Sequence, residues 1–161
     1  MMWPMPTLLL ALAVISTGLY AGFMLIFLTG IMPGFARLSD EQFVAAMRRV
    51  NETVPRAVFL LVFVAIVAFP AAALAVPVEG RTATERWLIV AGLVCAVLNH
   101  LVTVAGNIPL NNALAASENA TPPVSDSRVR AAFETRWNRL HLVRTLLTLA
   151  AFVLLVCAAL P

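Results

Sequence analysis

The composition of this chain excludes an ordinary soluble protein. Of its 161 residues, 61% are hydrophobic and only 12% are charged, whereas soluble domains average about 25% charged residues. The formal net charge of +3 does not indicate a nucleic-acid partner, because no basic run is interleaved with aromatic residues. With a mean hydropathy of +0.93, the chain is predicted to be an integral membrane protein whose surrounding partner is the lipid bilayer.

Four apolar stretches are each long enough to cross the hydrocarbon core, which takes about 20 helical residues. They lie at residues 7–32, 57–78, 87–106 and 140–160. The first has no Lys or Arg before it and is longer than the apolar part of a secretory signal, so we expect it to be retained. Because these stretches use up the chain, we expect an all-α fold, a membrane four-helix bundle that forms a single domain over residues 1–161.

The basic residues predict how the spans are oriented. All of them are Arg; nine lie between the first and second spans or between the third and fourth, including one just inside the fourth, and two lie between the second and third. Cytoplasmic loops carry an excess of basic residues. We therefore expect a multi-pass protein of the inner (plasma) membrane, with loops 33–56 and 107–139 in the cytoplasm and both termini outside.

The first of these loops predicts an additional amphipathic helix at residues 39–54. Ser39 followed by Gln42 fits a capping box at its start. Its apolar stripe comprises Phe43, Met47, Val50 and Val54. Asn51 lies near the edge of this stripe. We expect this helix to lie at the membrane interface or to pack under the bundle.

Polar side chains gather toward the cytoplasmic ends of the third and fourth spans. These residues are His100, Thr103 and Asn107, flanked by Asn99, in the third span, and Asn138, His141, Arg144 and Thr145 in the fourth. The two helices run antiparallel, so their polar faces lie at matching depth. Because polar groups in lipid find no water, we expect these faces to meet in one polar cavity.

The segment GNIPLNNAL, residues 106–114, places three Asn around a proline. Pro109 disfavours a helical conformation at Ile108 and removes a backbone hydrogen bond. Asn107, Asn111 and Asn112 are suited to pair with carbonyls that are left free in this way. The simplest interpretation is therefore that the third helix ends here and is capped by these amides.

The two histidines, His100 and His141, can also be interpreted as haem or metal ligands. A catalytic metal site usually has three protein ligands, and no Asp or Glu lies inside any span. We therefore expect no metal and no cofactor, and we interpret His100 and His141 as candidates for proton transfer. Arg144 has a structural alternative to a functional role: its side chain extends toward the cytoplasmic boundary of the membrane.

Four motifs in chain order resemble one family. They are AGFMLIFLTGIMPGF, MRRVNETVPRAVF, VTVAGNIPLNNAL and TRWNRLHLVRTLL, and together they are similar to the four-span membrane family of anthrone oxygenases. The resemblance covers residues 18–155. The positions that fit the family pattern are Asn51, Asn107, Pro109, Asn111, Trp137, Arg144 and Thr145. At His141 the chain departs from it, because Asn is often expected three residues before the Arg.

The resemblance implies an oxygenase that converts an anthrone to an anthraquinone. Such a reaction removes a proton from an activated methylene, stabilises the enolate and lets dioxygen react with it, without demanding a cofactor. The implied partners are a lipophilic aromatic small molecule and dioxygen. The expected catalytic residues are His100, His141 and Arg144. The expected substrate-binding residues are Asn51, Thr103, Asn107, Asn111, Trp137, Asn138 and Thr145.

A different class of function also stays open. The alternative is a non-catalytic membrane interaction or scaffold module, in which the polar faces hold the helices together or the amphipathic helix at residues 39–54 docks a partner. A transporter is a weaker alternative, because four spans without signs of inverted repeats would need oligomerisation. Homo-oligomer formation is left open by all three interpretations.

Overall fold

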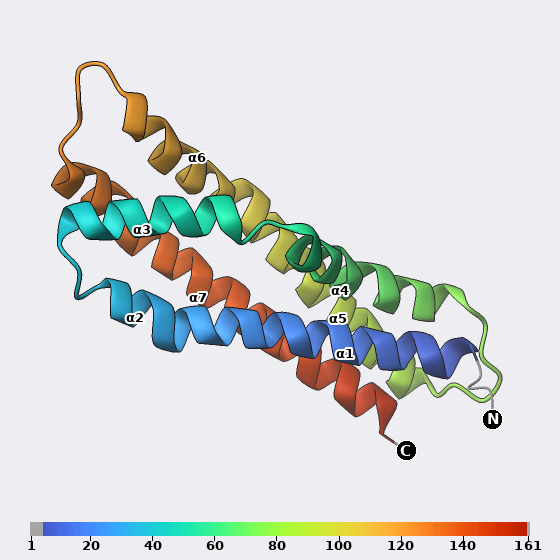
Figure 1. Cartoon of the computed structure of the whole chain (residues 1–161). Coiled ribbons are helices and arrows are strands. Elements are labelled where there is room, and N and C mark those ends of the chain that lie inside the picture. Colours follow the sequence, from blue (N-terminus) through green and yellow to red (C-terminus); the bar gives the residue numbers. More distant parts are fainter. Residues whose placement is uncertain (1–4, 161) are drawn as a thin grey trace.

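The computed structural model describes residues 5–160, and in this part of the chain every regular element is a helix and none is a strand (Figure 1). In chain order the elements are α1 (Met5–Ile26), η1 (Phe27–Ile31), α2 (Met32–Phe35), α3 (Asp40–Thr53), α4 (Ala57–Ala75), α5 (Ala83–Val102), η2 (Thr103–Asn107), α6 (Ile108–Ala116), η3 (Ser117–Asn119) and α7 (Asp126–Ala159). The all-α prediction is thus confirmed.

The four predicted spans are all found as long apolar helical segments. Their bounds are Met5–Phe35, Ala57–Ala75, Ala83–Asn119 and Asp126–Ala159. Each of these segments is long enough, or nearly long enough, to cross the hydrocarbon core of a membrane. The chain is therefore a multi-pass membrane protein. In Figure 1 the described ends of the chain lie at one end of the molecule, and α3 lies at the other.

The long helices pack against one another in pairs. Helix α5 packs against α7, α1 packs against both α4 and α7, and α4 packs against α5. Turn η2 also lies close to α7, because a Cβ added at Gly106 would come within 2.8 Å of a Leu140 methyl group and would force that side chain to shift. This contact holds the third and fourth spans together next to the polar residues of both.

Two of the long helical segments widen into a π-helical turn just before a proline. Turn η1 precedes Pro33, and turn η2 precedes Pro109. In a regular α-helix, a proline ring collides with the carbonyl four residues earlier. In η2 the Ile108 N–H instead reaches the Thr103 carbonyl, five residues back, and this wider turn gives the ring room.

The expectation that the third helix ends at residues 106–112 is therefore wrong. Ile108 keeps helical backbone angles, with φ −61° and ψ −47°, and the helical segment runs on to Asn119. The physical reason is the π-helical turn, which accommodates Pro109 without breaking the helix. The asparagines of this segment are consequently available for contacts with other helices.

Helix α3 begins as the capping box predicts. The Ser39 side chain accepts a hydrogen bond from the Gln42 N–H at 3.3 Å, and the Gln42 side chain accepts one from the Ser39 N–H at 3.2 Å. Its apolar residues Phe43, Val44 and Met47 are buried, and the helix packs against α7 and α6. Most of its apolar stripe is therefore used inside the chain, under the ends of the spans.

Arg130 on α7 holds in place the segment that leads into α3. Its guanidinium donates hydrogen bonds to the carbonyls of Ala36 (3.1 Å) and Leu38 (2.8 Å) and to the carboxylates of Asp40 (3.1 Å) and Glu134 (2.7 Å). The same group lies 4.5 Å from the centre of the Phe43 ring. Several charge-assisted bonds to one planar group hold a segment more firmly than a single exposed ion pair does.

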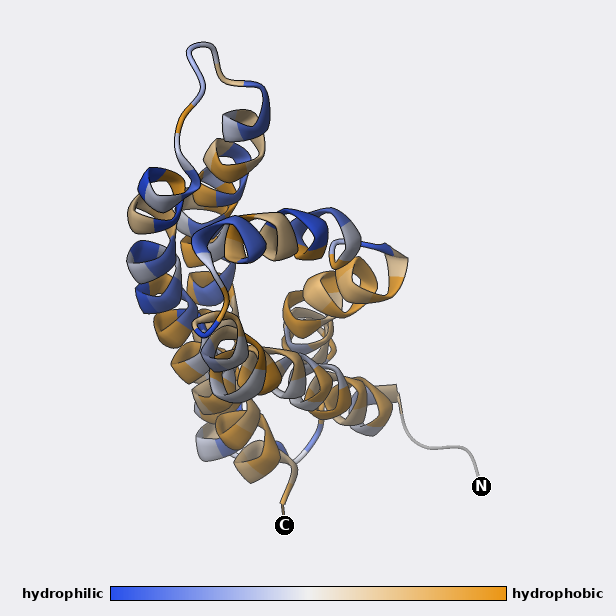
Figure 2. Cartoon of the chain, turned by 60° about the vertical axis from the view of Figure 1, so that its left-hand side comes forward, coloured by the Kyte–Doolittle hydropathy of each residue, from blue (hydrophilic) through white to orange (hydrophobic). Residues whose placement is uncertain are grey.

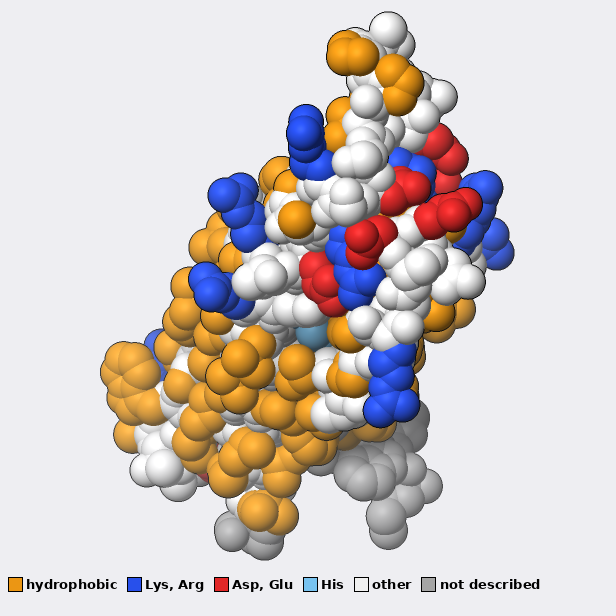
Figure 3. All heavy atoms as spheres, turned by 90° about the vertical axis from the view of Figure 1, so that its left-hand side faces the viewer, with side chains coloured by type: hydrophobic (Ala, Val, Ile, Leu, Met, Phe, Trp, Pro, Cys, Tyr) orange, Lys and Arg blue, Asp and Glu red, His pale blue; other side chains and the backbone are white. Residues whose placement is uncertain are grey.

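Polarity is distributed along the molecule as membrane insertion requires. Figure 2 shows hydrophobic residues over the lengths of α1, α4 and α5, and hydrophilic residues over α3 and the neighbouring part of α7. In Figure 3 the Arg, Asp and Glu side chains crowd one part of the face, and hydrophobic side chains cover much of the rest. The polar end of the bundle therefore lies next to α3.

Candidate functional site

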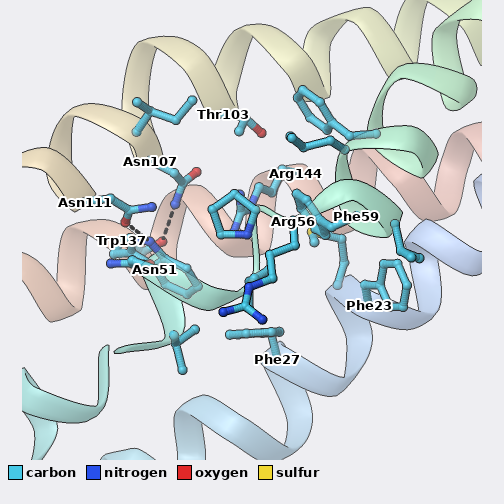
Figure 4. Close-up of a pocket in the computed structure, with 18 of the residues that line it drawn as sticks. Phe23, Phe27, Asn51, Arg56, Phe59, Thr103, Asn107, Asn111, Trp137 and Arg144 are labelled. Carbon is cyan, nitrogen blue, oxygen red and sulfur yellow. Dashed lines mark hydrogen bonds between the residues drawn. The ribbon is translucent and has the colours of Figure 1, made fainter. Parts of the chain in front are cut away.

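A cavity of about 620 Å³ opens where α3 meets the polar ends of the spans (Figure 4). Its walls come from α1, the end of α3, the start of α4, the third span and α7. The aromatic residues on these walls are Phe23, Phe27, Phe59, Phe63 and Trp137. The polar ones are Asn51, Arg56, Thr103, Asn107, Asn111, Asn112 and Arg144. Its size falls within the range of about 300–1,000 Å³ typical of small-molecule sites.

Arg144 is the most deeply placed charge on this cavity. Its side chain is only 8% exposed, its Nε donates a hydrogen bond to His141 Nδ1 at 3.0 Å, and its guanidinium lies 5.1 Å from the centre of the Trp137 ring. Among residues 5–160, no Asp or Glu lies within ion-pair distance of it. A buried cation without an acidic partner is costly, so its free N–H groups suit an anionic atom in the cavity.

His141 lies behind Arg144 and is fully buried. Its Nδ1 accepts from Arg144, so Nε2 carries the proton and donates to the Met24 carbonyl at 3.0 Å. The ring is stacked on Trp137, with 4.8 Å between ring centroids. Both nitrogens are therefore engaged, and the arrangement suits a residue that positions Arg144.

The two asparagines that flank Pro109 hold Trp137 from the neighbouring helix. Asn111 accepts a hydrogen bond from the Trp137 indole N–H at 2.9 Å, and the Asn107 amide donates to the Trp137 carbonyl at 3.4 Å. Figure 4 shows both contacts as dashed lines. The Asn-x-Pro-x-Asn segment thus fastens the third span to α7 and orients an aromatic wall of the cavity.

Two amide atoms at this end of the cavity have no protein partner. They are the buried Oδ1 of Asn107 and the buried Nδ2 of Asn51, and both residues line the cavity. Buried amide atoms normally pair with protein, water or ligand. Both atoms are enclosed by the protein, so one acceptor and one donor can serve a bound molecule beside Trp137 once their side chains shift.

His100 is half-buried and does not line the cavity. Its ring is stacked on Phe63 at a centroid distance of 3.8 Å, and Phe63 does form part of the wall. The Nδ1 atom lies 2.9 Å from the Ala96 carbonyl. Because that contact requires a proton on Nδ1, Nε2 keeps a free lone pair.

The structure thus brings together six of the ten predicted site residues around the cavity, and four lie outside its walls. Asn51, Thr103, Asn107, Asn111, Trp137 and Arg144 line the cavity. His100, Asn138 and Thr145 do not line it; the Thr145 hydroxyl instead donates to the His141 carbonyl at 2.7 Å. His141 reaches the cavity only through Arg144.

Two further buried polar residues were not assigned a catalytic or binding role from the sequence, although Asn99 was expected to flank the polar face of the third span. Tyr20 and Asn99 are both fully buried, and within the described part of the chain neither the Tyr20 hydroxyl nor either amide atom of Asn99 has a hydrogen-bond partner. The Tyr20 hydroxyl is close to the side chains of Asn99 and Thr103, and its ring packs against Phe59. The signal for Tyr20 in the sequence was that it is the only Tyr of the chain and lies within the first span, close to Ser16 and Thr17.

These observations define a class: a four-span membrane protein with an aromatic cavity, on whose wall lies a buried arginine that has no acidic partner among residues 5–160. The family whose description is "Anthrone oxygenase" matches residues 43–154, more than half of the chain. The chain therefore belongs to the anthrone oxygenase family, and the resemblance noted in the sequence is confirmed. Neither the comparison with curated proteins nor the comparison with solved structures found a match.

Proposed function

We propose that this protein is a cofactor-independent membrane oxygenase that converts a lipophilic aromatic ketone with an activated methylene, of the anthrone type, to the corresponding quinone. The observation that carries the proposal is Arg144, a buried cation without an acidic partner that faces an aromatic cavity. Family membership supports the reaction class. The aromatic walls fit a flat ring system that enters from the bilayer.

The reaction balances without a reductant. An anthrone and one dioxygen give an anthraquinone and one water. The methylene first loses a proton to give an enolate, which passes one electron to dioxygen; the two radicals then combine at the ring carbon. After a proton returns, the resulting hydroperoxide loses water and leaves the new carbonyl, so one oxygen atom enters the product and the other leaves as water.

Within this scheme Arg144 stabilises the charge that develops on the ketone oxygen. Donors fixed in a water-poor site stabilise an enolate more than mobile water does. The stacked pair of His141 and Trp137 holds the guanidinium in place before the substrate binds. The free amide atoms of Asn51 and Asn107 supply a donor and an acceptor to polar groups of the ring system.

We assign removal of the proton to His100. Of the two histidines in the chain, it is the one whose second ring nitrogen has no hydrogen-bond partner among residues 5–160. Phe63 separates its ring from the cavity, so the transfer requires a movement of Phe63 or a bridging water. General-base catalysis by such a residue contributes about 10²- to 10⁴-fold to the rate.

Oxygen uptake tests this proposal. The purified protein in a non-ionic detergent is given 1,8-dihydroxyanthrone, and uptake is compared with the protein-free rate in the same detergent. We expect uptake above background, together with formation of the anthraquinone. Arg144→Gln should reduce the enzymatic part by about 10²-fold or more, whereas Arg139→Gln, an exposed position on the same helix, should retain it.

Two results would count against the proposal. A wild-type rate equal to the protein-free rate would favour the non-catalytic membrane module instead. Equal rates in wild type and Arg144→Gln would show that catalysis does not depend on this cation.

A further inference from the structure

A second arginine lines the same cavity. Arg56 is the N-cap of α4 and directly follows Pro55; its side chain is exposed, and it belongs to the cavity wall. Figure 4 shows Arg56 and Arg144 both reaching into the space that the aromatic side chains enclose. The cavity therefore has one cation at its rim and one in its interior.

Neither cation is neutralised by the protein. None of the residues that line the cavity is Asp or Glu, and the ion pairs found within residues 5–160 involve only Arg49 and Arg130. Two guanidinium groups without an acidic partner, in a concave site with apolar walls, focus a positive potential on whatever binds there. The cavity is thus matched to a ligand with net negative charge.

The two arginines differ in what they can recognise. Arg144 is buried and held by His141, which suits the ketone oxygen that becomes charged during the reaction. Arg56 is exposed and lies at the rim of the cavity, to whose wall Phe27 and Phe59 also belong. A group bound there lies at the outer edge of the ring system, away from the reacting carbon.

We propose that the ligand of this cavity is an aromatic acid: a flat ring system whose outer edge carries a carboxylate that pairs with Arg56. Arg56 is then a specificity-determining residue, because a guanidinium binds a planar carboxylate through two parallel hydrogen bonds. The proposal rests on the proposed function for the role of Arg144 but not for that of Arg56.

A phospholipid phosphate is the other source of an oxyanion for Arg56. Arginines at the ends of membrane spans commonly extend toward headgroups, and Arg56 immediately precedes the second span. Both sources share one chemistry, an oxyanion attached to an apolar body. The experiment must therefore separate a carboxylate on the ring from a phosphate of the bilayer.

Binding of two matched anthraquinones in phosphatidylcholine nanodiscs tests the proposal. The probes are anthraquinone-2-carboxylate and 2-methylanthraquinone, which have the same ring system and differ in charge. Both are already oxidised, so their binding does not depend on turnover. We expect wild type to bind the carboxylate about tenfold more tightly than the methyl compound, as one charge-assisted pair allows.

Three variants make the result specific. Arg56→Gln should bind the two probes with about equal affinity, and Arg56→Lys should keep part of the preference for the carboxylate because the charge remains. Arg37→Gln, an exposed arginine outside the cavity, should keep all of it. Equal affinities for the two probes in wild type, or an unchanged preference in Arg56→Gln with its melting temperature preserved, would overturn the proposal.

Added phosphatidylglycerol separates the two sources. If the preference of wild type for the carboxylate persists in nanodiscs that contain this anionic lipid, Arg56 binds the ring substituent as proposed. If the anionic lipid abolishes the preference, headgroups occupy Arg56 and the proposal is overturned. Failure of the proposed function would appear differently, as absent oxygen uptake with 1,8-dihydroxyanthrone while the binding preference remains.

Discussion

Arg144 donates its Nε–H to Nδ1 of His141, three residues earlier on the same helix, at 3.0 Å. This hydrogen bond gives both buried side chains a partner. A guanidinium at this depth needs an acceptor, and the imidazole supplies one without adding a negative charge that would neutralise the arginine. The cation therefore stays available to the cavity, and His141 works by positioning it.

Replacing His141 tests this relationship. His141→Phe keeps an aromatic ring against Trp137 but removes the acceptor, so we expect kcat with 1,8-dihydroxyanthrone to fall at least tenfold. His141→Asn places an amide oxygen within reach of Arg144, as in the residue that the family resemblance leads us to expect here, and should retain more activity. Steady-state kinetics on both variants checks this; equal losses would contradict the acceptor role.

Trp137 and Asn111 should be energetically coupled. Trp137→Phe removes the indole N–H and leaves Asn111 Oδ1 without its partner at 2.9 Å, which should lower the free energy of unfolding by about 0.5–2 kcal/mol. A double-mutant cycle with Asn111→Ala, measured by denaturation in detergent micelles, isolates the pair. A coupling energy near zero would show that the hydrogen bond contributes nothing.

Arg130 should hold α3 against α7. Arg130→Ala removes the contacts with Ala36, Leu38 and Asp40 together, so we expect α3 to exchange its amide hydrogens faster and overall stability to fall by about 2–3 kcal/mol. Hydrogen exchange followed by mass spectrometry measures both effects. Arg128→Ala, an exposed neighbour on the same helix, is the matched control and should leave α3 unchanged.

Asn99 should be a residue that lowers stability. Neither of its side-chain amide atoms has a partner, although the residue is fully buried, so Asn99→Leu should raise the free energy of unfolding by about 1–3 kcal/mol. The same change should reduce turnover if the amide serves the site next to Thr103. A lower melting temperature for Asn99→Leu would mean that the amide is already satisfied, most simply by an internal water.

The sequence predicted the spans and α3 because these depend on local pattern. Apolar length determined the spans, and Ser39 with Gln42 placed the start of α3, as the structure confirms. The path of the chain at Pro109 was mispredicted, because the effect of a proline depends on whether the preceding turn can widen, and no residue pattern of the segment specifies a π-helical turn.

The composition of the site was only partly predictable, for a similar reason. Helical spacing identified the polar faces of the third and fourth spans, which led to Asn107 and Arg144. It did not show that Phe63 separates His100 from the cavity, or that Arg56 from another helix contributes to the rim. Such relationships depend on how the helices pack against one another, which periodicity within one helix does not encode.

The central claim is that Arg144 stabilises an enolate in the cavity, and anaerobic absorbance spectroscopy tests it most directly. Without oxygen, 1,8-dihydroxyanthrone bound to the protein cannot react further, and its keto and enolate forms have different spectra. We predict the enolate spectrum on wild type at a pH where the free compound is in the keto form, and the keto spectrum on Arg144→Gln. A bound keto form on wild type, or the same enolate fraction on both proteins, would contradict the account.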